Sequence, residues 1–382
     1  MDSFHPPSRK DYLDRQQKQG RGLFGVFPGR YPREIFWTLN VLPVEVWDPP
    51  LDTSGSGAHL QPTICSVVKS GLELIRQGRC GMLDGFLFPH TCDSLQNLGS
   101  LVRDDLRVGK PCLDFYPSKI PDGPVARAFF RKEIERLSSA LEPLYGPLDS
   151  SALSHWAARA RELAEALETL YSLRAEGRLD TTNVEFYRLV RSVEFMHPDD
   201  LIPVLSGFLK DRVLSEPLTS PAIVLSGVLP TPWGLLSLLD DLGVRIGDDD
   251  LLSCGRRIPG VCGSEKDPVA AVMESYFGMP PCSTTHAPLG ERALQLLERV
   301  HRSRARGVLF SIVKFCEPEL FAYPALRDSL KRQGIGTLFL EHDVNREVPG
   351  QVATRLEAFV EMIEDRGSEE MRNRLKGPGG VS

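Results

Sequence analysis

The alternation of strand-like and helix-like segments is the feature that most limits what this chain can fold into. Apolar runs such as MLDGFLF (residues 82–88) and GVLFSIVKF (residues 307–315) have the composition of buried strands, and each precedes a segment of helical period. Strands joined through helices lie parallel, because the crossover connection returns the chain to the same end of the sheet. The sequence therefore predicts an α/β fold with parallel sheets.

This alternation occurs in two blocks, residues 22–124 and residues 220–366. Between them, residues 125–219 consist of long amphipathic segments with few strand-like runs, and this pattern predicts helices. A chain of 382 residues is too long for one ordinary core. We therefore expect two Rossmann-like domains joined by a helical linker region, with an N-terminal arm at residues 1–21 and a flexible tail at residues 367–382.

Charge and hydropathy argue against nucleic-acid binding, secretion and insertion into a membrane. The chain has 45 Lys and Arg against 51 Asp and Glu and no long basic run, so the positive surface expected of a nucleic-acid-binding protein is missing. The polar N-terminus lacks the apolar core of a signal peptide, and no later run reaches the length of a membrane span. We expect a cytoplasmic protein whose eight cysteines stay reduced and serve as ligands or as core residues.

Three of the cysteines occupy related positions in the predicted topology. Cys92 and Cys316 follow the two apolar runs above, and Cys65 opens the helix after the Gly/Ser loop SGSGAHLQPT. Parallel sheets bind ligands at the carboxyl ends of their strands, and helix N-termini favour thiolates. A cysteine at a strand end is, however, more often a small buried residue, and no CxxC pair indicates a zinc site or a ferredoxin-like cluster. The spacing alone leaves both interpretations open.

Several segments, in order along the chain, resemble the benzoyl-CoA reductase/2-hydroxyacyl-CoA dehydratase family. They are LQPTICSVVKSGLE, LDGFLFPHTCDSLQNL, SGVLPTPWGLLSLLDDLG, DDDLLSCGRR and KFCEPELFAYPALRDSLKRQGIGTLFLEHD. The resemblance runs from about Gly22 to Arg366 and is strongest to the beta-type or reductase-type iron-sulfur subunits. It implies a [4Fe-4S] cluster held between two Rossmann-like domains by Cys65, Cys92 and Cys316.

The resemblance also implies a reaction and a set of partners. Members are heteromeric 2-hydroxyacyl-CoA dehydratases, which are lyases, or benzoyl-CoA reductases, which are oxidoreductases, and both use radical one-electron chemistry on a CoA thioester. The implied partners are a second homologous subunit, an ATP-dependent iron-sulfur activator protein and an acyl-CoA substrate. Three cysteines leave one iron of a cubane without a protein thiolate, and that iron is then open to water or to a substrate oxygen. Cys65 is followed by Ser66 where some members have proline, so the subfamily stays open.

Two other functions remain compatible with the sequence. One is a homodimeric reductase of small molecules with a double-cubane cluster, which would need Cys254 or Cys282 as a further ligand. The other is a non-catalytic α/β scaffold subunit that binds no cluster. The acyl group, and the choice between dehydration and ring reduction, are not encoded in a motif.

Other residues near the predicted strand ends are weaker candidates. His90 and Lys314 lie close in sequence to Cys92 and Cys316, so either side chain is positioned to tune a cluster there, while a structural hydrogen bond to the loop is the alternative for His90. Asp93 and Glu317, each directly after a cysteine, are expected to cap helices.

Further carboxylates and one glycine complete the set of predictions. Glu45 is expected on an exposed sheet face rather than toward a site. Glu341 and Asp343 follow a strand and are candidates for positioning, proton transfer or loop capping, with Arg355 as a candidate partner for one of them. Gly227 is expected to have a backbone role, since the first loop of a strand-loop-helix unit often approaches a ligand closely.

Overall fold

The computed structural model describes residues 6–47, 51–260, 267–344, 346 and 348–375. Within these ranges the chain forms two parallel four-stranded sheets with the orders β2-β1-β3-β4 and β6-β5-β7-β8. The strands are β1 (Gly22–Val26), β2 (Val41–Glu45), β3 (Gly85–Pro89), β4 (Cys112–Phe115), β5 (Ala222–Gly227), β6 (Arg245–Leu251), β7 (Gly307–Val313) and β8 (Gly336–His342). The same strand order in both sheets confirms the predicted α/β class with two Rossmann-like units.

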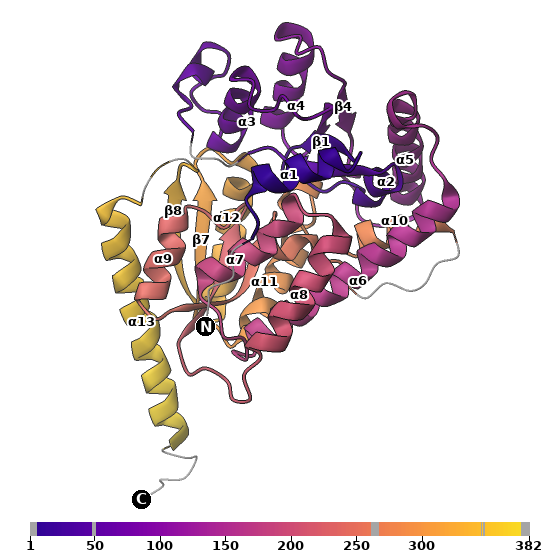
Figure 1. Ribbon diagram of the computed structural model, residues 1–382. Coiled ribbons are helices and arrows are strands. Elements are labelled where there is room, and N and C mark those ends of the chain that lie inside the picture. The colour runs from indigo at the N-terminus through magenta and orange to yellow at the C-terminus, as the bar shows by residue number, and fades with distance from the viewer. Residues whose placement is uncertain (1–5, 48–50, 261–266, 345, 347, 376–382) are drawn as a thin grey trace, which may run out of the picture.

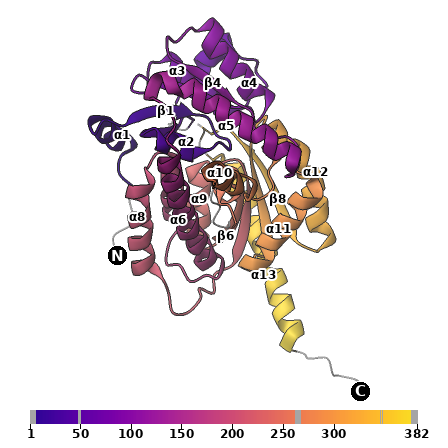
Figure 2. The same cartoon turned by 90° about the vertical axis from the view of Figure 1, so that its right-hand side faces the viewer.

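Helices cover both sheets and connect them (Figure 1). They are α1 (Arg9–Lys18), α2 (Arg33–Thr38), α3 (Ser66–Arg76), α4 (Asp93–Ser100), α5 (Pro124–Tyr145), α6 (Ser150–Ala175), α7 (Asn183–Arg191), α8 (Pro198–Arg212), α9 (Trp233–Asp241), α10 (Pro268–Phe277), α11 (Leu289–Ser303), α12 (Glu317–Arg332) and α13 (Gly350–Leu375). Helix α6 contacts α2 beside the first sheet and β6 in the second (Figure 2). The helical region thus packs against both sheets.

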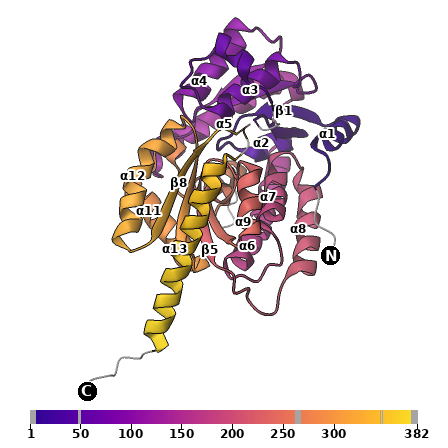
Figure 3. The ribbon, with the colours of Figure 1, turned by 90° about the vertical axis from the view of Figure 1, so that its left-hand side faces the viewer.

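The C-terminal helix α13 runs from Gly350 to Leu375, away from the second sheet (Figure 3). Its first half packs on β8 through buried side chains such as Leu356 and Ile363. The tail predicted to be flexible from residue 367 begins inside this helix, and residues 376–382 lie outside the described residues. Among the described residues, no helix combines the length and the apolar character that a membrane span requires.

Glu45, at the end of β2, is buried, so the prediction of an exposed sheet face was wrong. Its Oε1 lies 3.3 Å from Nη2 of Arg33 and also pairs with Nη1 of Arg257, which comes from the loop after β6. A buried carboxylate needs such partners because its charge has lost its water. Glu45 therefore forms an ion pair between the two domains that no local pattern encodes.

Gly227 ends β5 at a point where the neighbouring strand β7 lies very close. A Cβ atom at this position would lie 2.2 Å from the carbonyl oxygen of Ser311. The expected backbone role of Gly227 is confirmed, because no side chain fits between the two central strands of the second sheet.

We expect Gly227→Ala to lower the free energy of unfolding by roughly 3 kcal/mol or more, because the backbone of β5 or β7 must move. Gly207→Ala is the matched control, since a methyl group added at Gly207, in α8, would meet no atom within 4 Å. That change should stabilise the chain by up to about 1 kcal/mol through helix propensity. Urea unfolding measures both; equal effects of the two variants would contradict the close-approach argument.

Candidate functional site

The structure places Cys65, Cys92 and Cys316 at the N-caps of α3, α4 and α12. Cys92 follows β3 and Cys316 follows β7, and these two strands hold the same position in their sheets. Phe315, directly before Cys316, has a left-handed backbone with φ +64°, a conformation that costs energy for a residue with a side chain. The turn that delivers Cys316 is therefore held in place by its surroundings.

The three thiols are close enough to influence one another. Burial raises the pKa of Cys65 to about 12, and a charge on Cys92 adds to this effect. Burial also raises the pKa of Cys316 well above its ordinary value, with further contributions from Cys65, Glu319 and Cys92. The pKa of Cys92 is likewise raised by burial. The thiols are therefore neutral at pH 7, and a metal centre would have to displace their protons.

The three cysteine thiols are of the donor type that iron-sulfur clusters take. Among the described residues, no three His, Cys, Asp or Glu side chains surround a common point where one ion would sit. A cubane takes each thiolate on a different iron, so its ligands do not converge on one point. The structure places three buried or half-buried thiols at three helix N-termini, and these are the residues that would hold such a cluster.

His90 and Lys314, the predicted neighbours of the cysteines, have few polar contacts. The ring of His90 lies 5.1 Å from that of Tyr116, and its buried Nε2 has no hydrogen-bond partner among the described residues. Its backbone N–H donates to the carbonyl oxygen of Phe115, so the loop is held by the main chain and not by the imidazole. Nζ of Lys314 lies 5.1 Å from the centre of the Phe315 ring.

Lys119 is a neighbour that the sequence did not indicate. Its Nζ donates to the carbonyl oxygens of Thr284 at 2.7 Å and of Thr91, the residue before Cys92, at 3.4 Å. Burial lowers the pKa of Lys119, and the charges of Cys92 and Cys282 act against that shift. A cation in this position would offset negative charge at Cys92. The only signal in the sequence was its place in the loop after β4.

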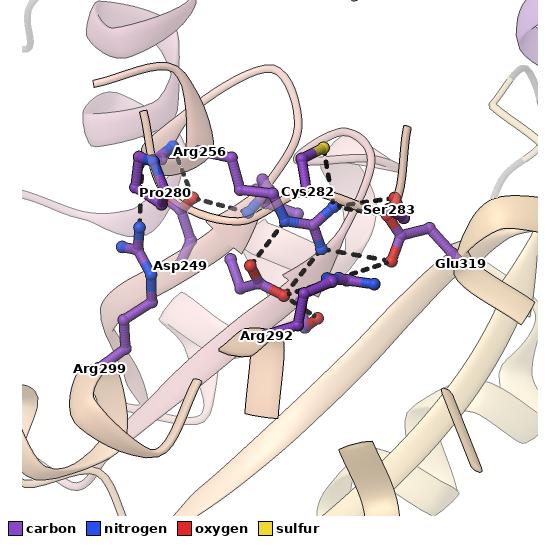
Figure 4. A network of polar contacts seen from close by, with 12 residues as sticks. Asp249, Arg256, Pro280, Cys282, Ser283, Arg292, Arg299 and Glu319 are labelled. Atoms are coloured by element: carbon purple, nitrogen blue, oxygen red, sulfur yellow. Dashed lines mark hydrogen bonds and ion pairs between the residues drawn. The ribbon is translucent and has the colours of Figure 1, made fainter. Parts of the chain in front are cut away.

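A buried ionic network borders the cysteine site (Figure 4). Nε and Nη2 of Arg256 donate to the two carboxylate oxygens of Asp250 at 2.6 and 2.7 Å, and Nη1 donates to Glu319 at 2.5 Å. Arg292 lies 3.3 Å from both carboxylates. Glu319 lies in the first turn of α12, and Cys316 is the N-cap residue of the same helix. The network therefore fixes the start of α12.

Strand β6 carries two more buried aspartates beside Asp250. Asp248 accepts from Nη1 of Arg299 at 2.8 Å. Asp249 accepts from the hydroxyl groups of Tyr171 at 2.6 Å and Tyr187 at 3.1 Å, and burial raises its pKa. Each carboxylate of the DDD motif thus has its own partners, which come from several different elements.

Cys282 and Cys254, which the sequence left unassigned, are both fully buried, but their pKa values shift in opposite directions. Burial by itself raises the pKa of Cys282, but the positive charges of Arg30, Arg256 and Arg292 outweigh this effect and lower it to about 7. Burial raises the pKa of Cys254 well above its ordinary value, and Asp249 adds to the shift. Cys282 therefore has thiolate character at the edge of the network, whereas Cys254 is a neutral core thiol.

Several sequence predictions around the site are corrected. Asp93 and Glu317 do not cap their helices; the cysteines hold the N-cap positions, and the two carboxylates lie in the first turns, where the helix dipole favours them. Arg355 does not pair with Glu341 or Asp343, since its Nη2 donates to the carbonyl oxygen of Phe339 at 2.8 Å. Of the remaining cysteines, Cys80 is buried, Cys112 is half-buried and Cys262 lies outside the described residues.

Fold and site together define a two-domain α/β protein with thiols gathered at the carboxyl ends of its parallel strands. The chain belongs to the 2-hydroxyglutaryl-CoA dehydratase D-component family, whose profile matches residues 29–363. This match confirms the resemblance found in the sequence.

Named relatives are similar to this chain over most of its length. The beta subunit of (R)-phenyllactyl-CoA dehydratase from Clostridium sporogenes is 22% identical, with 93% of this chain and 95% of the relative aligned. The beta subunit of lactoyl-CoA dehydratase from Anaerotignum propionicum is 24% identical over the same shares. A benzoyl-CoA reductase subunit from Thauera aromatica is 24% identical, with 82% and 84% aligned. These relatives thus include subunits of dehydratases and a subunit of a reductase.

We expect Arg256→Met to lower the free energy of unfolding by about 3–5 kcal/mol at neutral pH, because Asp250 and Glu319 lose their main cation while buried. The pKa values of both carboxylates are lowered in the folded wild type, so their stabilising effect is present above the ordinary carboxyl pKa of about 4 and is lost as the pH falls. The deficit of the variant should therefore persist from pH 7 to about pH 4 and shrink as the pH falls further toward about pH 2.

Denaturant unfolding over this pH range measures the effect. Arg327→Met is the control, since its ion pair with Asp328 is exposed and should contribute little to stability. A deficit of Arg256→Met that does not change with pH would contradict the electrostatic origin.

Proposed function

We propose that this chain is the [4Fe-4S]-binding subunit of a heteromeric, cytoplasmic enzyme that carries out radical one-electron chemistry on a CoA thioester, as a 2-hydroxyacyl-CoA dehydratase or a benzoyl-CoA reductase. The observation that carries this proposal is the placement of Cys65, Cys92 and Cys316 at three neighbouring helix N-termini in a member of this family. Similarity to both dehydratase and reductase subunits supports the enzyme class and leaves the acyl group open.

The three cysteines would hold the cluster, which when bound supplies electrons one at a time to the thioester. The helix N-termini of α3, α4 and α12 stabilise the thiolates through their N–H groups and partial positive charge. The ammonium group of Lys119 adds positive charge near Cys92. The imidazole of His90, whose Nε2 has no hydrogen-bond partner in the described part of the chain, is available to donate a hydrogen bond or a proton toward the site. The Arg256 network keeps α12, and with it Cys316, in position.

The division of labour between subunits is part of this proposal. The relatives are all named as single subunits of larger enzymes, which supports a second, homologous subunit as partner. The other partners that we expect are an ATP-dependent iron-sulfur activator protein and an acyl-CoA substrate. We place the partner subunit on the adjoining helices α12 and α11, where Phe321 and Leu294 are 80% and 68% exposed.

One observation supports the alternative of a double-cubane cluster. Cys282 has a lowered pKa, and its Sγ lies 3.9 Å from Nη1 of Arg256, so its thiolate character suits a ligand. Cys254 does not fit this function, because its pKa is raised and its neighbours are a serine hydroxyl and core residues. The scaffold alternative predicts a well-folded chain that binds no cluster.

We expect anaerobically purified protein to contain about four iron and four sulfide per chain. Cys65→Ser, Cys92→Ser and Cys316→Ser should each lose most of the iron, because a cubane with only two protein thiolates is poorly held. Cys80→Ser is the matched control, since Cys80 is also buried and lies in the turn after α3, apart from the three helix N-termini. Iron and sulfide analysis with EPR of the reduced protein measures this.

The three outcomes separate the candidate functions. Loss of iron in the three variants alone supports the single cubane. About twice as much iron, lost also in Cys282→Ser, would favour the double-cubane reductase. A folded, iron-free wild type would overturn the cluster assignment and favour the scaffold.

Phe321→Ser should weaken association with the partner subunit by at least about tenfold, because it removes a large apolar contact from the proposed interface. Leu218→Ser, at a 41% exposed leucine between α8 and β5, is the control and should leave association unchanged. Sedimentation of the co-expressed subunits gives the dissociation constant. Unchanged binding of Phe321→Ser would place the interface elsewhere.

A further inference from the structure

A pocket lies between the two domains, away from the three cysteine helices. It encloses about 710 Å³ of space between atoms, including the solvent at its mouth. Its walls come from the segment after β1, from α2 and α6, and from the loop after β6. Cys92 and Cys316 follow β3 and β7 instead, so the two sites use different strands of the same carboxyl edge. This edge is where open parallel sheets bind ligands.

Apolar side chains form one wall of this pocket. Trp37 lies on α2, Leu163 and Leu167 lie on α6, and Val190 and Val193 follow on α7 and the turn after it. They present aromatic and aliphatic surface from three helices. Such a wall suits a hydrocarbon group and offers nothing to a purely polar ligand.

Three arginines, Arg30, Arg33 and Arg257, also line the pocket. Arg33 and Arg257 share a single carboxylate, that of Glu45. Arg30 donates to backbone carbonyl oxygens after β6 and before Cys282, one of them at 2.7 Å, and pairs with no carboxylate among the described residues. Positive charge in the pocket wall therefore exceeds the negative charge that Glu45 supplies.

Glu34 is the acidic residue that lines the pocket itself. It is buried in α2, and burial raises its pKa to about 7, so a large share of this carboxyl group is protonated at neutral pH. The excess of positive charge from the three arginines therefore persists, and it becomes larger as the pH falls below 7.

The pocket wall also contains donors that have no acceptor. Nε and Nη2 of Arg257, Nε of Arg30 and Nε1 of Trp37 are buried, and within the described residues no hydrogen-bond partner reaches them. All three residues line the pocket. A buried N–H group without an acceptor is costly, and such groups are rare unless a bound molecule satisfies them.

We propose that this pocket binds a small organic carboxylate, with the carboxylate on the N–H groups of Arg30 and Arg257 and the hydrocarbon tail against Trp37 and the α6 leucines. A guanidinium fork matches the two oxygens of a carboxylate. The apolar wall gives the tail a place that inorganic phosphate could not use. This site shares no residue with the three cysteines, so the inference goes beyond the proposed function and does not depend on it.

Calorimetric titration of the full-length, anaerobically purified chain tests the proposal with hexanoate and cyclohexylacetate as probes. We expect one molecule to bind per chain, and we expect hexanamide, acetate and inorganic phosphate to bind at least about tenfold more weakly, because each lacks the charge or the tail. Binding of hexanamide or phosphate as tight as that of hexanoate would overturn the carboxylate assignment, and so would no binding of either probe at millimolar concentration.

Two variants locate the site. Arg30→Met removes one of the two guanidinium groups that hold the carboxylate, and it should weaken hexanoate binding by at least about tenfold. Leu163→Trp fills the space beside Trp37 and should abolish binding. Arg131→Met, at an exposed ion pair on α5 outside the pocket, is the matched control. Thermal unfolding checks that each variant is folded; unchanged affinity in folded Arg30→Met and Leu163→Trp would overturn this location.

Iron content is measured on the same samples. Loss of hexanoate binding with iron retained supports a pocket independent of the cluster. The cysteine variants should keep hexanoate binding, so failure of the cluster assignment and failure of this inference give different results.

Discussion

The burial of three consecutive aspartates in β6 is the constraint on which this structure depends. Alternate residues of a strand face opposite sides of a sheet, so the partners of Asp248, Asp249 and Asp250 must come from different elements. A carboxylate without water is costly unless charges or donors replace that water. The DDD motif therefore requires α6, α7, α11 and the loop after β6 to pack at fixed positions around one strand.

The partners of Asp250 carry this requirement into the candidate site. Arg256 binds Asp250 and Glu319 at once, and Glu319 lies in the first turn of the helix that Cys316 opens. The same arginine lowers the pKa of Cys282, together with Arg30 and Arg292. A single guanidinium thus joins a strand of the second domain to the helix that presents a cysteine, and the geometry of that cysteine follows from the ionic network.

The carboxyl edges of the two sheets carry two chemically different groups of side chains. The segments after β3 and β7 gather thiols at helix N-termini, and the segments after β1 and β6 gather arginines beside apolar helix faces. Glu45 joins the two domains as the carboxylate that Arg33 and Arg257 share. Relatives 22–24% identical match most of the chain.

The sequence by itself determined the two strand and helix blocks and the places of Cys65, Cys92 and Cys316 at helix starts, because hydrophobic period and chain order are local properties. It also indicated a backbone role for Gly227. Only the tertiary structure decided that Glu45 is buried, that Lys119 lies beside Cys92 and that Arg256 joins Asp250 to Glu319. Those contacts bring together side chains that are mostly far apart in the chain, and which charges pair depends on how two sheets and their helices pack.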